Sequence, residues 1–522
     1  MKFGRKHKTN MWWQLSFCCS IAVLMLSSGV LQARVTYFKP TTSQYFGTFK
    51  SGTYIKLTGN IKGELATNEA IPDLSKSDKE YAGKVSYETD IELIIPEDPG
   101  LSNGTLIFDV KNRGKTVAHF LYNSPRGVSV TNDDIGLGFL EDEGFMIATA
   151  NWELGHGITL PSFIDAGQKR FVEAVGLAAV RDIIVFFKYQ EVDDEGNINP
   201  LYGAVQSAVG VGYSQSALFL KTSLLNGFNW MHGRKVFDGL HLHASHAGQL
   251  PIMGSGPGPF SSGVKFPTYS HPDISGVHVS PFTYQQLVTE LSLRGETPPR
   301  IVVTNTTSDY YSLRASLART GVDGTADVEI PKNVRIYDIA GSAHIILPYR
   351  GCTTDRGNLD WHPLMRSTLL NLHYWVSRDL APPESQLMPL EHRPDDPAIL
   401  AAPPDFPDAL LQVPQRDKDG NDIGGVRLPE MQVPIATYSG QNGPVSSVLC
   451  TLSGSYSPFP FNKRKRSNSR DSRISIKERY ASKNVYVDLI AQAARALIEA
   501  GFLLDSDAWM INHAAAVNKT VR

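Results

Sequence analysis

Three side chains in this sequence could together carry out acyl transfer: Ser214, Asp309 and His344. A serine hydroxyl becomes a nucleophile when a histidine takes its proton and a carboxylate holds that histidine in the correct tautomer. The three residues occur in the order serine, acid, histidine, which is one of the chain orders known for such a site. The chemistry therefore depends on a fold that brings three distant segments together.

The segment around Ser214 has the pattern of a strand, a sharp turn and a helix. Val209–Val211 is a run of small and β-branched residues that suits a buried parallel strand, and Ala217–Leu225 has apolar residues at helical spacing. A serine at such a corner projects its hydroxyl above the sheet, and small residues must lie two positions on either side. Gly212 and Ser216 meet that need, although Ser216 stands where the usual pattern has glycine. The five-residue pattern alone also arises by chance, so the flanking strand and helix support the prediction.

The acid and the base each follow a predicted strand. The strand Pro299–Thr304 leads into a loop that contains Asp309, and the strand Asn333–Ile339 leads into a loop that contains His344. The carboxyl ends of parallel strands lie at one edge of a sheet, so both side chains are expected beside the serine. Asp338 is the alternative acid, but it falls within the strand pattern, where its side chain would not reach that loop.

An oxyanion that develops on a substrate needs two backbone amides. One is expected from Gln215, because the residue after the nucleophile presents its amide at the start of the helix. The second is expected from Asn112-Arg-Gly, which follows the predicted strand Thr105–Val110, with either Gly114 or its neighbour Arg113 as the donor. The alternative for Gly114 is an ordinary turn without a role in the chemistry.

A metal site is the main competing interpretation of the polar residues. His241 and His243 lie at alternate positions of a predicted strand, with His246 shortly after, and could face one metal ion. No acidic residue at helical spacing supports such a site, so the sequence predicts no metal and no other cofactor. The run Asp417–Asp422 lacks the glycine and the glutamate of a calcium-binding EF-hand loop and is expected to form a polar turn.

The composition is that of a soluble protein without nucleic acid as a partner. Of 522 residues, 42% are hydrophobic and 20% are charged, and the net charge is −2. A nearly neutral chain lacks the basic excess that attracts phosphate backbones. The short basic run Lys463–Arg466 lies among serines and is expected to be a solvated turn.

Residues 1–33 differ from the rest of the chain. A basic head is followed by an apolar block, Met11–Leu31, and by the small residue Ala33, which is the layout of a secretory signal peptide. The protein is therefore expected to be secreted or periplasmic, with no membrane contact beyond that segment; an uncleaved N-terminal anchor is the alternative. Removal of the leader would leave Cys352 and Cys450, which an oxidising compartment would allow to pair.

The remaining chain has a β-rich part and then alternates between strands and helices. Residues 34–104 have the alternating pattern of strands in a half-exposed sheet. Beyond them, strands interleave with helices such as Arg170–Tyr189, which predicts an α/β fold with a mostly parallel sheet covered by helices on both faces. Residues 245–295 are expected to form a lid or pocket wall, and residues 381–522 a proline-rich surface wrap with a closing helix, Val485–Ala500.

The chain resembles the secreted bacterial α/β-hydrolase domain-containing proteins over nearly the whole of residues 34–522. The segments that carry the resemblance are Asn112-Arg-Gly, Gly212-Tyr-Ser-Gln-Ser216, Ser308–Leu317, Val334–His344, Ala381-Pro-Pro-Glu-Ser385, Asp419-Gly-Asn, Arg427-Leu-Pro, Ala436–Gly440 and Glu478-Arg-Tyr480. The resemblance implies an α/β-hydrolase fold and a serine, acid, histidine site, which here falls on Ser214, Asp309 and His344. That family usually has glutamate as the acid, so the shorter side chain of Asp309 must reach the same histidine.

These observations lead us to expect a serine esterase that cleaves small-molecule carboxylic esters through an acyl-enzyme on Ser214. Two alternatives stay open. The same site could serve an amidase or a polyester depolymerase. The fold could also persist as a catalytically inactive binding protein.

Overall fold

The computed structural model describes residues 35–78, 83–245, 247–250, 281–346, 359–402, 406–442 and 448–522, together with Cys352, Asp355 and Gly357. All of them belong to the same unit, Ala33–Arg522. The predicted signal peptide, residues 1–33, lies outside the described residues. Within the described ranges, no helix has the length and apolar character needed to cross a membrane.

One large sheet organises this unit. Nine of its ten strands are, in spatial order, β1 (Val35–Phe49), β2 (Gly52–Ala66), β3 (Lys84–Pro96), β5 (Met146–Ala150), β4 (Thr105–Asp109), β9 (Ser207–Tyr213), β12 (Gly239–His243), β13 (Arg300–Thr306) and β14 (Val334–Ile339), and the short strand β6 (Ile158–Thr159) pairs with β3. The strands from β5 to β14 are parallel to one another, and β1, β2 and β3 add antiparallel strands at one edge. The predicted mostly parallel sheet is therefore confirmed.

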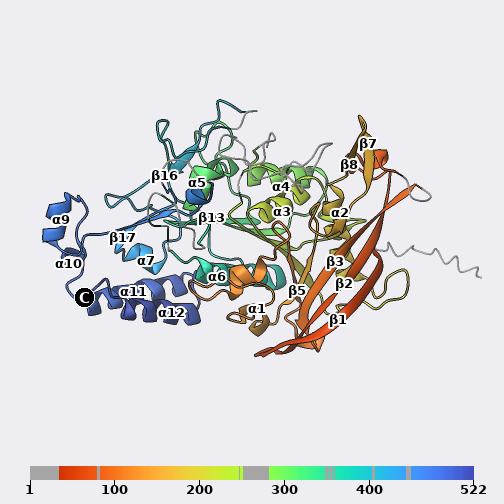
Figure 1. The fold of residues 1–522 in the computed structure, drawn as a ribbon, viewed down its shortest axis with the longest axis horizontal. Helices are drawn as coiled ribbons and strands as arrows, with labels where there is room; N and C mark the ends of the chain where they lie inside the picture. Colours follow the sequence, from red (N-terminus) through yellow and green to blue (C-terminus); the bar gives the residue numbers. More distant parts are fainter. Residues whose placement is uncertain are drawn as a thin grey trace, which may run out of the picture. The chain divides into compact units, whose positions relative to one another are not determined.

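Helices cover both faces of the sheet, as the sequence predicts (Figure 1). They are α2 (Val175–Tyr189), α3 (Gln215–Leu225) and α4 (Tyr284–Leu293) on one face, and α6 (His362–Arg378), α11 (Lys483–Glu499) and α12 (Asp505–Val517) on the other. In the central strand β4, Leu106 and Phe108 join the first core, whereas Ile107 joins the second. Successive side chains of a strand point to opposite faces, so a strand between two cores must be apolar throughout.

The chain beyond α6 covers the open edge of the sheet at β14. The amide of Gln386 donates to Ile336 and the amide of Asp338 donates to Gln386, both at 2.9 Å. Further along the same edge, the amide of Val426 donates to Asp338 at 2.7 Å. An unpaired edge strand would offer its amides to other chains, so this cover protects the sheet from aggregation.

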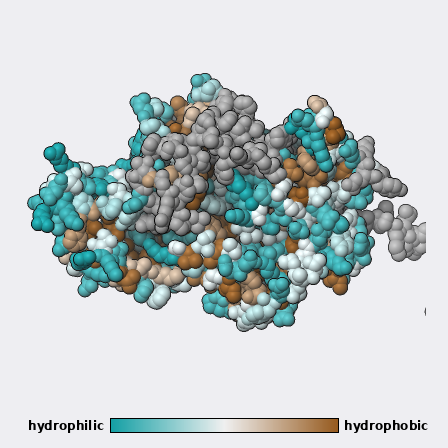
Figure 2. Space-filling model, viewed as in Figure 1, coloured by the Kyte–Doolittle hydropathy of each residue, from teal (hydrophilic) through white to brown (hydrophobic). Residues whose placement is uncertain are grey.

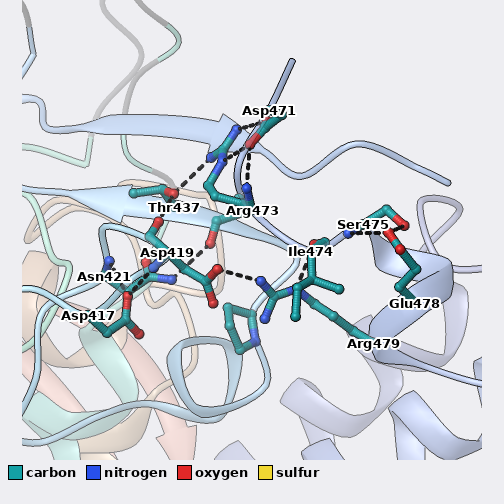
Figure 3. A network of polar contacts seen from close by, with 12 residues as sticks. Asp417, Asp419, Asn421, Thr437, Asp471, Arg473, Ile474, Ser475, Glu478 and Arg479 are labelled. Atoms are coloured by element: carbon teal, nitrogen blue, oxygen red, sulfur yellow. Dashed lines mark hydrogen bonds and ion pairs between the residues drawn. The ribbon is translucent and has the colours of Figure 1, made fainter. Parts of the chain in front are cut away.

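The run Asp417–Asp422 forms a tight polar turn, as predicted (Figure 3). The amides of Asp419 and Asn421 donate to Asp417 Oδ1 at 2.8 and 2.9 Å. Arg479, from the C-terminal part of the chain, forms an ion pair with Asp419 at 2.6 Å. The carboxylates of Asp417 and Asp419 therefore bond to donors of the protein itself. Asp422, the last residue of the turn, is fully buried.

The helix expected to begin at Arg170 begins instead at Val175. Residues Gln168–Phe171 form strand β8, which pairs with β7 (Ser162–Asp165) in a small hairpin. The cause is the turn at Ala166 and Gly167, both of which have positive φ. Such a turn reverses the chain and continues it as a strand.

The basic run Lys463–Arg466 is not the predicted turn but the start of helix α9 (Lys463–Ser469). The side chain of Asn462 caps this helix by accepting the amide of Lys465 at 2.9 Å. All residues of the helix except the half-buried Arg466 are exposed, and Figure 2 shows hydrophilic residues at the left end of the view, where Figure 1 places α9. The expected solvation of the run is thus correct, whereas its expected conformation is wrong.

The two cysteines outside the predicted leader, Cys352 and Cys450, form a disulfide. Cys450 lies in the short helix α8 (Val448–Leu452). Within the predicted 245–295 insertion, residues 246 and 251–280 lie outside the described residues, and α4 covers the first face of the sheet.

Candidate functional site

Ser214 lies at the sharp corner between strand β9 and helix α3, as the sequence predicts. Its backbone has φ 57° and ψ −115°, a conformation that non-glycine residues rarely adopt and that costs about 1–3 kcal/mol. A Cβ atom on Gly212 would lie 2.6 Å from the backbone of Ser216, so only glycine fits there. Ser214 is only partly buried, in contrast to the buried residues that follow it in helix α3.

Ser216 replaces the usual second glycine and stabilises the corner. Its hydroxyl accepts the amide of Tyr213 at 2.9 Å and donates to the carbonyl of Tyr213 at 3.1 Å. The serine side chain therefore folds back onto the strand end, where it satisfies backbone groups that the turn would otherwise leave without partners.

The predicted nucleophile, base and acid lie in one hydrogen-bonded row. His344 Nε2 lies 3.1 Å from Ser214 Oγ, and His344 Nδ1 lies 2.6 Å from Asp309 Oδ1. With the Nδ1 proton donated to the carboxylate, Nε2 is left to accept the serine hydroxyl. The aspartate, despite its shorter side chain, reaches the histidine directly.

Asp309 lies in a short helix and not in the predicted loop. It is the third residue of α5 (Thr307–Ser312), where its Oδ2 accepts the amide of Thr306 at 2.7 Å as part of a capping box. Asp309 is fully buried, so both carboxylate oxygens have fixed partners. The alternative acid Asp338 is also fully buried and forms an ion pair with Arg319 at 2.8 Å, as expected of a residue within the strand.

The loop that carries His344 is held against the nucleophile corner by Tyr213. The Tyr213 hydroxyl donates to the His344 carbonyl at 2.5 Å, and the two rings stack with centroids 5.1 Å apart. Earlier in the loop, Gly341 has φ 71°, and a Cβ there would lie 2.8 Å from Met431. His344 is 3% exposed, so its ring has little freedom to move away from Ser214.

The Asn112-Arg-Gly segment forms a tight turn that is tied to the corner on both sides of Ser214. Asn112 and Lys115 exchange backbone hydrogen bonds, and the central residues Arg113 and Gly114 have φ 50° and 72°. The Asn112 side chain donates to the Tyr213 carbonyl at 2.8 Å. The Arg113 amide donates to the side-chain oxygen of Gln215 at 3.2 Å. The turn therefore contacts both neighbours of the nucleophile.

Of the amides considered for the oxyanion, those of Gln215 and Gly114 donate to no acceptor within the described residues. The Gln215 amide opens helix α3, where the first amides have no acceptor inside the helix. Gly114 packs so closely on His156 that an added Cβ would lie 2.8 Å from the ring nitrogen Nδ1. The Gly114 amide is thus without an acceptor among the described residues, whereas its Cα lies against the imidazole ring.

One buried acid near this turn was not singled out from the sequence. Glu153 follows β5, is 4% exposed, and accepts the Gln215 side-chain amide at 2.8 Å through Oε1. Burial raises the pKa of Glu153 to about 7, against the opposing effect of the Gln215 hydrogen bond. Its place just beyond the carboxyl end of a parallel strand was the available signal.

His241 and His243, on the predicted strand, are buried and form hydrogen bonds inside the protein. His241 Nδ1 lies 2.5 Å from the Tyr122 hydroxyl, and His243 Nδ1 lies 2.8 Å from the Thr304 hydroxyl. Burial lowers the pKa of His241 to about 3. His246 lies outside the described residues, and within the ranges that are described no three His, Cys, Asp or Glu side chains gather as a metal site would require.

Comparisons with known proteins place this geometry in a wider context. The family model described as an alpha/beta hydrolase domain matches residues 173–513. Among solved structures, a glucuronoyl esterase from Solibacter usitatus has 12% identity and a TM-score of 0.29, with 58% of this chain and 80% of that chain covered. Esterase 2 from Thermogutta terrifontis, phosphonylated by sarin, has 13% identity and a TM-score of 0.28, with 56% and 92% covered. No curated protein matches the sequence.

Proposed function

The chain belongs to the alpha/beta hydrolase domain family, and we propose that it is a serine hydrolase that cleaves carboxylic esters. The observation that carries this proposal is the row Asp309, His344, Ser214, with its two short distances of 2.6 and 3.1 Å. A partly buried serine at a strained corner, with a buried histidine and a buried aspartate behind it, suits nucleophilic attack.

In the first half of the reaction, Ser214 Oγ attacks the acyl carbon and His344 Nε2 takes the hydroxyl proton. Asp309 holds the imidazole ring in position and stabilises the imidazolium that forms. The tetrahedral intermediate then collapses, the bond to the alcohol oxygen breaks, and His344 returns the proton to that oxygen. The alcohol leaves and an acyl-enzyme remains on Ser214.

In the second half, a water molecule attacks the acyl carbon while His344 takes one of its protons. The bond between the acyl carbon and Ser214 Oγ breaks, and the proton passes from His344 to the serine oxygen. The carboxylic acid leaves and the free enzyme is restored. The side chains needed for every proton transfer belong to this chain, so the proposed reaction uses no cofactor.

Each tetrahedral intermediate carries a negative oxygen, for which we propose the amides of Gln215 and Gly114 as donors. The Arg113 amide, the other candidate of the turn, donates to the Gln215 side chain, which favours Gly114 for the substrate. Loss of one such donor costs about a hundredfold to a thousandfold in kcat in enzymes of this kind.

An amidase or a polyester depolymerase would use the same groups, and a panel of ester, amide and polyester substrates separates these from a small-molecule esterase. We also propose that the protein acts outside the cytoplasm, because residues 1–33 have the layout of a signal peptide. Mass analysis of the N-terminus of the exported protein tests cleavage after Ala33.

The central test uses Ser214→Ala and, as a matched control, Ser223→Ala in the helix α3 that follows Ser214. The wild type and the Ser223→Ala variant are expected to hydrolyse p-nitrophenyl acetate and to react with a fluorophosphonate probe. The Ser214→Ala variant is expected to do neither, with an unchanged melting temperature. Hydrolysis that persists in folded Ser214→Ala, or a folded wild type that neither reacts with the probe nor hydrolyses the ester, contradicts the proposal.

A further inference from the structure

We propose that Glu153 is a positioning residue for the oxyanion amides and that it acts through the side chain of Gln215. The proposal rests on the proposed function, since it concerns how the site would hold a negative oxygen. Glu153 comes from the segment after β5, far from the nucleophile in sequence. It contacts the nucleophile corner through Gln215, the residue directly after Ser214, and it also interacts with the backbone of Arg113.

The first step of the argument is the orientation of a carboxamide. Gln215 Nε2 donates to Glu153 Oε1 at 2.8 Å, and Gln215 Oε1 accepts the Arg113 amide at 3.2 Å. An ionised carboxylate accepts hydrogen bonds but donates none, so it can bind only the NH2 end of the carboxamide. Glu153 therefore turns the oxygen end of Gln215 toward the Arg113 amide.

The second step is what this oxygen holds. The Arg113 amide belongs to the tight turn that also contains Gly114, one of the two proposed oxyanion donors. The other anchor of the turn is the bond from Asn112 to the Tyr213 carbonyl, at 2.8 Å. With both anchors in place, the turn is fixed relative to the helix start that presents the Gln215 amide. If Gln215 turned over, its NH2 group would face the Arg113 amide, two donors would meet, and the turn would lose one anchor.

The third step concerns the surroundings of the carboxyl group. Glu153 faces the Arg113 side chain, Glu173 and the His156 ring, whose Nε2 lies 3.8 Å from Oε2. Apart from the Arg113 amide, which helps to stabilise the ionised carboxyl group, no group within the described residues donates a hydrogen bond to Oε2. Burial and the neighbouring Glu173 raise the pKa of Glu153 to about 7, so the carboxyl group changes its charge near neutral pH. Once protonated, it can donate to Gln215 Oε1 and compete with the Arg113 amide.

These contacts determine the direction in which pH changes kcat. Above the pKa of Glu153 the ionised carboxylate fixes Gln215 as seen here, and below it the carboxamide is released. The kcat of the wild type is therefore expected to fall on the acid side as Glu153 becomes protonated, near pH 7. In Glu153→Gln, which keeps the shape but cannot ionise, this part of the fall in kcat is expected to be absent.

A double-mutant cycle tests whether Glu153 acts through Gln215. Glu153→Ala and Gln215→Ala both keep the backbone amides, and each is expected to lower kcat about tenfold with KM changed less than twofold. Both variants break the same connection, which runs from Glu153 through the Gln215 side chain to the Arg113 amide. The double variant is therefore expected to lose no more kcat than either single variant. Multiplied losses of about a hundredfold, or an unchanged kcat in Glu153→Ala, overturn the proposal.

Two controls separate this proposal from loss of folding and from failure of the proposed function. Melting temperatures show which variants are folded, and labelling by the fluorophosphonate probe shows whether Ser214 is reactive. If the wild type is fully labelled and Glu153→Ala has the kcat of the wild type, only the role of Glu153 is contradicted. An unreactive wild type contradicts the proposed function itself.

Glu173→Gln removes the neighbouring charge that raises the Glu153 pKa, so the acid-side fall in kcat of this variant is expected at lower pH.

Discussion

The carboxylate of Asp422 accepts the backbone amide of Gly341 at 2.9 Å, three residues before the proposed catalytic base. The same oxygen, Oδ2, accepts the hydroxyl of Thr307 at 2.5 Å, two residues before the proposed acid. Asp422 is the last residue of the polar turn Asp417–Asp422. Arg479 forms an ion pair with Asp419 of that turn (Figure 3). The C-terminal part of the chain thus contributes one buried atom that joins the segments of both residues.

We expect Asp422→Ala to lower kcat about tenfold because the segments of Asp309 and His344 lose their shared acceptor. The loss of a buried hydrogen-bond acceptor is also expected to lower the free energy of unfolding by about 1–3 kcal/mol. Asp422→Asn is the matched control, since its amide oxygen can still accept from Gly341 and Thr307, and it should keep most of the activity. Ester hydrolysis and urea unfolding measure both effects, and wild-type kcat in folded Asp422→Ala would contradict the expectation.

Tyr213→Phe is expected to lower kcat about tenfold, equivalent to about 1.4 kcal/mol of transition-state stabilisation, with little change in KM. The hydroxyl that holds the His344 carbonyl is lost, while the ring that stacks on the imidazole stays. Tyr337→Phe is the control, because its hydroxyl donates in the same way to the carbonyl of Pro383, at 2.6 Å, without contact with His344. Equal kcat losses in the two variants would show that the Tyr213 bond has no specific role.

The disulfide is expected to stabilise the segments beside the proposed acid and base. Within α8, the carbonyl of Thr451 accepts the Ser312 hydroxyl at 3.2 Å, and that of Leu452 accepts the Ile345 amide at 2.8 Å. Removal of a bridge with a sequence separation of 98 typically costs about 2–5 kcal/mol. Replacement of Cys352 and Cys450 by serine should lower the free energy of unfolding by that amount.

Dithiothreitol provides the control for this prediction. It should destabilise the wild type as the substitution does and leave the serine variant unchanged. A wild type whose unfolding curve is the same with and without dithiothreitol would contradict a stabilising bridge.

The positions of Ser214, Asp309 and His344 could be read from the sequence because each follows a strand of one parallel sheet. Each such strand can be recognised locally, because its apolar run and the turn after it are visible in the sequence itself. The same logic failed at Arg170, where a two-residue turn placed a strand ahead of the expected helix. It failed again for the loop of Asp309, because Thr306 and Asp309 form a capping box that starts a helix.

The residues that hold the site in place could not be found in this way. Glu153 meets Gln215 across 62 positions of the chain, and Asp422 meets Thr307 across 115. A single buried acid has no periodic pattern, and its partner is chosen by tertiary packing and not by spacing. Asp417–Asp422 was recognised as a turn, but which of its carboxylates enters the interior depends on contacts with Gly341, just beyond β14, and with Thr307 of α5, which the sequence does not display.

Asp109 should make the stability of the protein depend on pH between about 4 and 6. It is fully buried at the end of β4, where its carboxylate accepts the amides of Val117 and Ala118 at 3.0 Å. Burial raises the pKa of Asp109 to about 6, whereas an unfolded chain has a value of about 3.9. Between these values the folded state binds more protons than the unfolded state, so stability falls as pH rises from about 4 to 6.

The contribution of Asp109 to this fall is expected to be about 3 kcal/mol at most, which corresponds to a pKa difference of about two units. Asp109→Asn keeps an oxygen for the Val117 amide and cannot ionise, so its free energy of unfolding should fall less over the same pH range. Urea unfolding of both proteins at intervals from pH 4 to 7 measures the difference, in which the contributions of all other groups cancel. Parallel curves for the two proteins would show that Asp109 titrates alike in the folded and unfolded states, against the expectation from its burial.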